Sequence, residues 1–211
     1  ATSFEWSWGD GTGDTTPTLV LGQADLAGKL PNRAGYDDPP TARTLNLPVA
    51  LAFYPDGGLL VAEYNNNRVV YYPPGAGTGA AATRVYGQGG SFTSTNYTSK
   101  SAASLFQPGG VAVGAGGVWI ADSSNNRVLF YNGTETTASR VLGQPDYSSS
   151  SGSVGASQLY WPWGLALDAS GGLWVADSTN HRVVYFPANS TVATQVLGQP
   201  DLSSNAQNRG G

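Results

Sequence analysis

The strongest constraint on the fold of this chain is a stretch of sequence that occurs three times. The third copy reads Pro162–Asp168, Gly172–Asp177 and Asn180–Phe186, and the same pattern spans 48–72 and 108–131. A short tail ending in Gly-Gln closes each copy and also stands once ahead of them: its last residues are Gln23, Gln88, Gln144 and Gln199. Repetition at a fixed period is typical of folds in which each copy is one supersecondary unit. The sequence therefore predicts a repeat architecture.

Each copy has the pattern of four short antiparallel strands. Apolar runs alternate with Gly, Asn, Pro and Ser, which is typical of a meander with tight turns. In the third copy we expect strands at 164–168, 173–176, 182–186 and 194–198. Only 11% of the residues are charged, while 29 are Gly and 13 are Pro. This composition favours an all-β fold.

Residue size follows the repeat as well. Small residues recur two positions after the first proline of each copy: Ala50, Gly110 and Gly164. Bulky residues such as Trp119 and Trp174 stand on the next strand. Crowding of inner strands around a central axis requires small side chains there, and large rings fill the wider gap farther out. We interpret the tryptophans as packing residues, with ligand stacking as the alternative.

The repeated string P-x-G-[LV]-A-x-x-x-x-G-G-[LV]-x-V-A-D-x-x-N-x-R-[VL] resembles the NHL repeat. The resemblance covers three full copies and the flanking tails, with departures such as Ala50 for Gly and Glu63 for Asp. It implies a β-propeller with one four-stranded antiparallel blade per copy. We expect an N-terminal outer half-blade at 1–25, blades at 48–88, 108–144 and 162–199, and a C-terminal connector at 200–211.

Three polar residues share one spacing in every copy: an acid, Asn three positions later and Arg five positions later. The triads are Glu63, Asn66 and Arg68; Asp122, Asn125 and Arg127; and Asp177, Asn180 and Arg182. Acid and Asn flank a predicted turn, and Arg can pair with the acid. A catalytic group is usually unique, so recurrence favours a structural role; the alternative is a polar ring around one propeller mouth. The Gln tails are interpreted as strand terminators.

Chemically reactive residues are few. His181 is the single histidine and stands where the other copies have Asn67 and Asn126, so we expect a solvent-facing turn residue. The chain has no Cys, and one His cannot build a usual zinc site. The amidating lyases resemble this fold but bind zinc through several histidines, which this chain lacks. We expect no catalytic residues and no enzyme activity.

The N-terminal segment contains one candidate metal loop. Asp10, Thr12 and Asp14 alternate with Gly, as oxygen ligands do in a calcium loop. The distal bidentate acid of such loops is missing, so a Gly-rich hairpin turn is the favoured interpretation. Apart from N-linked glycans and this calcium candidate, we expect no cofactor and no metal.

Charge and sequons bear on partners and location. The net charge is −4, and lysine occurs only at Lys29 and Lys100, which argues against nucleic acid as a partner. No apolar run is long enough to cross a bilayer. Three Asn-x-Ser/Thr sequons are glycosylation candidates: Asn96, Asn132 and Asn189. Such motifs are used only at the surface of exported proteins. With the absence of Met, they favour a processed, extracellular glycoprotein.

The two ends of the chain suggest an incomplete ring. We expect Ser3–Trp6 to lie on a third strand and Thr18–Gly22 on an outer strand. Three blades cannot close alone, and uncovered blade faces and edges promote association. We therefore expect a structural scaffold module that associates with its own copies head to tail, as a filament or closed ring. The alternative is a ligand-binding or enzymatic propeller cut from a longer secreted protein, with no ligand identified.

Overall fold

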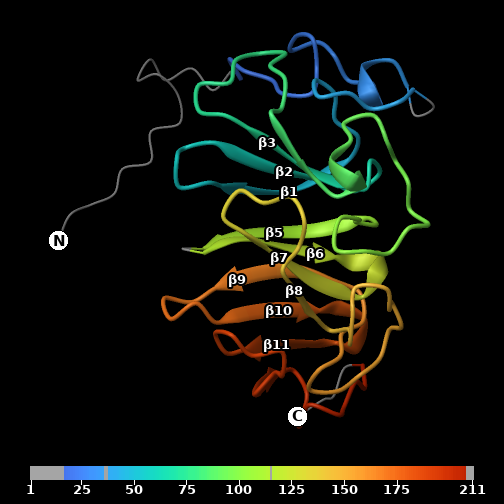
Figure 1. Cartoon of the computed structure of the whole chain (residues 1–211), viewed down its shortest axis with the longest axis vertical. Coiled ribbons are helices and arrows are strands. Elements are labelled where there is room, and N and C mark those ends of the chain that lie inside the picture. Colours follow the sequence, from blue (N-terminus) through green and yellow to red (C-terminus); the bar gives the residue numbers. More distant parts are fainter. Residues whose placement is uncertain (1–16, 36–37, 115, 208–211) are drawn as a thin grey trace, which may run out of the picture.

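A computed structural model describes residues 17–35, 38–114 and 116–207 of the chain. Three four-stranded antiparallel sheets follow one another along the long axis of the molecule (Figure 1). In each sheet the strand order equals the chain order. These sheets are the predicted blades, and they form an open arc in which blade 2 lies between blades 1 and 3.

The strands of each blade are joined by short turns. Blade 1 contains β1 (Pro48–Phe53), β2 (Leu59–Glu63), β3 (Arg68–Tyr72) and β4 (Arg84–Tyr86). Blade 2 contains β5 (Pro108–Gly114), β6 (Gly117–Asp122), β7 (Arg127–Asn132) and β8 (Arg140–Leu142). Blade 3 contains β9 (Pro162–Leu167), β10 (Leu173–Asp177), β11 (Arg182–Phe186) and β12 (Gln195–Leu197). The third blade confirms all four strands expected from its sequence, with ends that differ by at most two residues.

Single 3-10 turns complete the described elements. They are η1 (Pro31–Arg33), η2 (Gln88–Gly90), η3 (Ser123–Asn125) and η4 (Ser178–Asn180). The last two lie between the second and third strands of their blades, and the next residue is in the left-handed region, with φ of 53° at Asn126 and 52° at His181. Among the described residues, no helix is long and apolar enough to span a membrane.

Each blade has two apolar faces, because alternate residues of its strands point to opposite sides. We call the side toward the next blade in sequence the front face and the opposite side the rear face. One core joins the front of blade 1 to the rear of blade 2; its buried members include Leu60, Val69, Val111, Ile120 and Leu129. A second joins the front of blade 2 to the rear of blade 3; its buried members include Trp119, Val128, Leu173, Val175 and Phe186. A third, smaller core joins the rear of blade 1 to the segment ahead of it, where Val61, Val70 and Val85 pack with Leu21 and Leu45.

The predicted packing role holds for Trp119, which is buried in the second core. The need for small inner residues is clearest at Gly110. A Cβ atom there would lie 2.0 Å from the backbone oxygen of Trp163 on the inner strand of the next blade. Gly164 occupies the same position of blade 3, where a Cβ atom would meet only the Cβ of Ala176 at 3.6 Å. The difference arises because no blade lies in front of blade 3 among the described residues.

The expected outer strand at Thr18–Gly22 is not formed in the described part of the chain, where these residues are irregular. Its expected ladder partner, Ser3–Trp6, lies outside the described residues. The predicted pair of strands is therefore tested only at Thr18–Gly22. Gly22 nevertheless has φ of 82°, and the glycines that end the other tails have nearly the same value: 82° at Gly87, 87° at Gly143 and 85° at Gly198. The tail keeps its turn conformation without a ladder.

Gly110→Ala should destabilise the fold by about 1–3 kcal/mol, because the added methyl group forces blades 2 and 3 apart. The matched control is Gly164→Ala, which adds the same group at the equivalent position without a close contact. Urea unfolding followed by tryptophan fluorescence measures both. Equal unfolding midpoints for the two variants would contradict the crowding explanation.

Candidate functional site

The polar triads lie where the second strand of each blade turns into the third. Acid and Arg are directly opposite each other in the strand ladder, as in the pair Glu63 and Arg68. The distances from Arg Nε to the carboxylate are 2.6, 2.7 and 2.7 Å in blades 1, 2 and 3. The Asn side chain donates to the same carboxylate at 2.5, 2.9 and 2.9 Å. All three ion pairs are fully buried.

The carboxylates also accept a backbone N–H from the segment that leads into the inner strand. The donors are Asn46, Phe106 and Tyr160, at 3.1, 2.6 and 2.7 Å. Burial raises the pKa of each carboxyl group above its ordinary value, because the charged form loses hydration, while Arg and the N–H donors act in the opposite direction. Each acid is thus held by side chains of its own blade and by a backbone N–H of the segment that leads into the inner strand of that blade.

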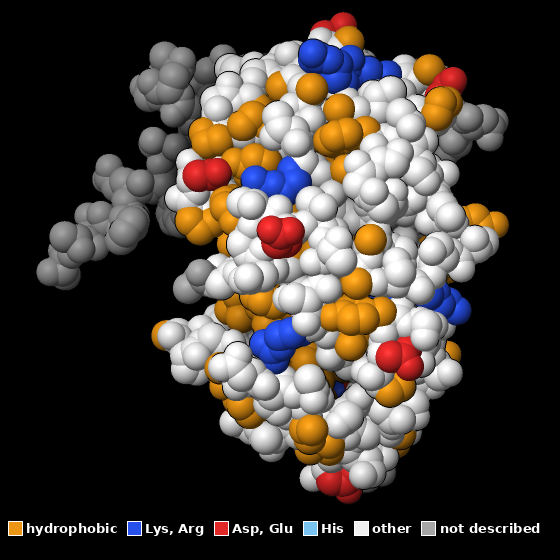
Figure 2. Space-filling model, in the orientation of Figure 1, with side chains coloured by type: hydrophobic (Ala, Val, Ile, Leu, Met, Phe, Trp, Pro, Cys, Tyr) orange, Lys and Arg blue, Asp and Glu red, His pale blue; other side chains and the backbone are white. Residues whose placement is uncertain are grey.

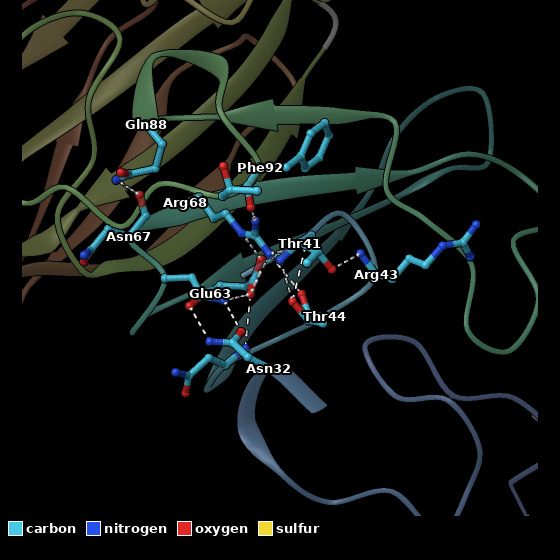
Figure 3. A network of polar contacts seen from close by, with 12 residues as sticks. Asn32, Thr41, Arg43, Thr44, Glu63, Asn67, Arg68, Gln88 and Phe92 are labelled. Atoms are coloured by element: carbon cyan, nitrogen blue, oxygen red, sulfur yellow. Dashed lines mark hydrogen bonds and ion pairs between the residues drawn. The ribbon is translucent and has the colours of Figure 1, made fainter. Parts of the chain in front are cut away.

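The Arg side chains reach farther than the acids. In blade 1, Arg68 Nη2 donates to the carbonyl oxygens of Thr41 and Thr44, both at 2.9 Å, ahead of the inner strand. Its Nη1 donates to the carbonyl of Phe92, after the outer strand, at 2.5 Å (Figure 3). The equivalent acceptors are Ser101, Ser104 and Tyr147 for Arg127, and Gly155, Gln158 and Leu202 for Arg182. Each Arg therefore clamps the connector before its blade to the connector after it.

The Gln tails extend this clamp. Gln88 Nε2 donates to the carbonyls of Asn67 at 2.8 Å and Asn96 at 2.9 Å. Gln144 and Gln199 repeat both contacts, with Asn126 and Ser151 at 2.8 and 2.9 Å, and with His181 and Ala206 at 3.1 and 2.8 Å. The sequence interpretation of a strand terminator missed this side-chain role. Each Gln fixes the start of the crossing to the turn that follows the triad Asn.

One further recurring pair was not found from the sequence. Tyr71 donates its hydroxyl to Asp56 Oδ2 at 2.6 Å, and Tyr185 donates to Asp168 Oδ2 at 2.8 Å. The bonds from the Ser170 side chain and from Tyr185 lower the pKa of Asp168 to about 2. Asp56 and Asp168 occupy different positions in the turn after their inner strands, so alignment of the copies does not reveal the pair.

The other predicted site residues lie on the surface or outside the described residues. Asn96, Asn132 and Asn189 are all exposed. Asn132 ends β7 and Asn189 lies between β11 and β12, so both stand in the turn before the outer strand. His181 is exposed. Asp10, Thr12 and Asp14 precede the described part. Within that part, no three His, Cys, Asp or Glu side chains gather in a way that could hold a metal ion.

The front face of blade 3 is uncovered by any described residue of another blade. It carries apolar side chains from β10, β11 and β12: Trp174, Val183, Tyr185 and Leu197. Leu197 is 57% exposed, while its equivalent in blade 2, Leu142, is 1% exposed. Trp174 is half-buried, whereas its equivalent Trp119 lies in the core between blades. The face thus has the composition of an internal junction and lacks its partner.

The rear face of blade 1 is open only in part, because Val61, Val70 and Val85 are buried against Leu21 and Leu45 of the segment ahead of the blade. Leu51 and Phe53 are 63% and 76% exposed, although the equivalent of Leu51 in blade 2, Val111, is buried. A hollow of about 410 Å³ lies on this face. Apolar side chains line it, among them Leu19, Leu21, Leu45, Leu51, Leu59 and Val61. On the side of the molecule shown in Figure 2, charged side chains are few and scattered among hydrophobic and uncharged polar ones.

A sequence model of the NHL repeat matches residues 107–130 and 159–186, which lie in blades 2 and 3. Blades 2 and 3 therefore each contain a match to the NHL repeat. Blade 1 shares the ladder register and the buried clamp of these two blades. No curated protein matches the chain in sequence.

Solved β-propeller structures resemble the chain at low identity. Virginiamycin B lyase from Staphylococcus aureus is 12% identical with a TM-score of 0.45, covering 79% of this chain and 46% of that one. A streptogramin B lyase is 13% identical with a TM-score of 0.46, covering 75% and 42%. Hydrazine synthase of Kuenenia stuttgartiensis is 13% identical with a TM-score of 0.51, covering 75% and 38%. The chain spans less than half of each, and the likeness concerns the fold alone.

Arg127→Met should destabilise the fold by about 3–5 kcal/mol, because the buried carboxylate of Asp122 and three carbonyls lose their partner. The control is Arg43→Ala, at an exposed Arg that donates to Gly79 O at 2.7 Å, where a change of at most about 0.5 kcal/mol is expected. Urea unfolding measures both. If the Arg clamp contributed nothing to stability, the two variants would have the same unfolding midpoint.

Proposed function

We propose that this protein is a non-catalytic structural module outside the cell, which associates head to tail with copies of itself. The observation that carries the proposal is the pair of open apolar faces, the front of blade 3 and the rear of blade 1. Leu51 is exposed although its equivalent Val111 is buried between blades 1 and 2, and Leu197 is exposed although its equivalent Leu142 is buried between blades 2 and 3. Uncovered apolar surface of this kind is costly in water and marks an interaction site.

The repeat itself indicates which surface covers each face. Inside the chain, the front of one blade packs on the rear of the next at two successive junctions. The front face of blade 3 corresponds to the front face in such a junction, and the rear face of blade 1 corresponds to the rear face. A second copy of the chain therefore offers a matching surface to the front of blade 3 and to the inner part of the rear of blade 1, where Leu51 and Phe53 are exposed. Contacts of this heterologous kind add copies in one direction and give a ring or a filament.

The non-catalytic part of the proposal is supported by the use of the recurring polar groups. The triad acids, their Asn partners and the Arg side chains are buried and engaged in bonds to the backbone or to one another. Groups held in this way serve the fold of every blade. The exposed Asn96, Asn132 and Asn189 support N-linked glycosylation of an exported protein, because two of them project from the same turn of successive blades.

Capping one open face at a time tests the assembly. Trp174→Glu places a charge on the front face, and Leu51→Glu places one on the rear face. Sedimentation velocity should show that the unmodified chain associates at micromolar concentration, that each variant alone is monomeric, and that an equimolar mixture forms a 1:1 complex through the two intact faces. Tyr97→Glu, at an exposed residue of the connector between blades 1 and 2, is the control and should associate like the unmodified chain.

Two outcomes would overturn this assembly. A folded, monomeric unmodified chain at micromolar concentration excludes self-association. Leu51→Glu that still dimerises alone would mean that two front faces meet each other, which is an isologous rather than a head-to-tail contact.

Glycosylation is tested on the chain secreted from a eukaryotic cell line. Treatment with peptide N-glycosidase should reduce its mass and convert occupied Asn residues to Asp, as read by peptide mass spectrometry. Thr134→Ala and Thr191→Ala remove the sequons of Asn132 and Asn189 without changing either Asn, and should each remove one glycan. A secreted chain with the unmodified polypeptide mass would contradict this part of the proposal.

A further inference from the structure

The residue that follows the triad Asn bridges each blade to the next. Asn67 and Asn126 occupy this position in blades 1 and 2, with φ of 54° and 53°. Asn67 Oδ1 accepts the backbone N–H of Gln107 at 2.9 Å, and Asn126 Oδ1 accepts that of Trp161 at 2.8 Å. The amide nitrogens of the two Asn side chains donate to carbonyls of the connector, Thr95 O at 3.1 Å and Ser150 O at 2.8 Å. Each internal junction therefore contains the same directional hydrogen bond.

The receiving residue is itself in an unusual conformation. Gln107 and Trp161 precede the proline of their inner strand and have φ of 52° and 57°. A left-handed conformation costs energy for a residue with a side chain and persists where its surroundings hold it. The bond from the preceding blade is one such restraint. It fixes the point at which the next inner strand starts.

Blades 1 and 3 present the two unmatched halves of this bridge. Leu47 precedes Pro48, has φ of 52° and is 51% exposed. Its backbone N–H has no hydrogen-bond partner within the described residues. His181 takes the place of the bridging Asn in blade 3, with φ of 52° and an exposed side chain. Its carbonyl accepts from Gln199, as the carbonyls of Asn67 and Asn126 accept from Gln88 and Gln144.

The backbone conformation at this position is thus the same in blade 3 as in blades 1 and 2, and only the side chain differs. A neutral imidazole has one nitrogen that donates and one that accepts, so it can replace both functions of the Asn amide. We propose that His181 of one copy accepts the backbone N–H of Leu47 of a second copy. This inference rests on the proposed head-to-tail assembly. It sets the register of the junction to that of the two internal junctions.

The capped pair of variants isolates one junction for the test. The Leu51→Glu protein supplies the front face with His181, and the Trp174→Glu protein supplies the rear face with Leu47. Adding His181→Ala to the Leu51→Glu protein should weaken the 1:1 complex roughly 3- to 10-fold, the effect of one neutral hydrogen bond. Adding His181→Asn there should restore the affinity to within about twofold, because Asn makes this bond at the internal junctions. Isothermal titration calorimetry measures each dissociation constant.

The same substitution in the other partner is the matched control. His181→Ala added to the Trp174→Glu protein lies on the capped face and should leave the dissociation constant unchanged. Equal affinity with and without His181→Ala in the Leu51→Glu protein would overturn the bridge while leaving the assembly intact. Failure of His181→Asn to restore affinity would also overturn it. A capped pair that forms no complex would overturn the assembly itself and the bridge with it.

Discussion

The structure depends on a buried ion pair that occurs once in every blade. Removing a carboxylate and a guanidinium from water is costly, and an isolated pair of this kind often contributes little to stability. Here the guanidinium also donates to three backbone carbonyls and the carboxylate accepts from an Asn amide and a backbone N–H. The charges therefore keep a full set of partners. Since the carbonyls belong to the connectors before and after the blade, the pair holds together segments that strand pairing does not join.

This placement of the polar groups leaves the blade faces free of them. The clamps lie at one end of the strands, where the second strand turns into the third, and the surfaces between blades are built from aliphatic and aromatic side chains. Neighbouring repeats in such an array interact mainly with each other, so each junction is nearly independent of the rest. The apolar face of one blade has few features that distinguish it from the apolar face of another blade. Register must then come from directional bonds at the ends of the strands.

The features that were predictable from the sequence are those that recur at constant spacing. The four strands of each copy and the triads could be aligned directly, because the same side chains have the same structural role in each blade. The bond between Tyr71 and Asp56 could not be aligned with its counterpart, since the acids stand two positions apart in turns of equal length. The left-handed residues before proline were also missed, because Leu47, Gln107 and Trp161 share no side-chain chemistry. Leu47 has the same φ although no other described blade bonds its N–H, so the conformation recurs in every blade without a side-chain pattern that reveals it.

A junction between copies meets a different requirement from a junction inside the chain. Internal blades are tethered, so their contact does not have to offset the loss of translational and rotational freedom that association of two molecules entails. In the proposed assembly, burial of large exposed side chains such as Phe53 and Leu197 would offset part of this loss. If the intermolecular junction repeats the internal register, each added blade turns by the same angle as the last. A ring then forms only where these turns sum to one full rotation, and any departure from that sum accumulates along a helical filament.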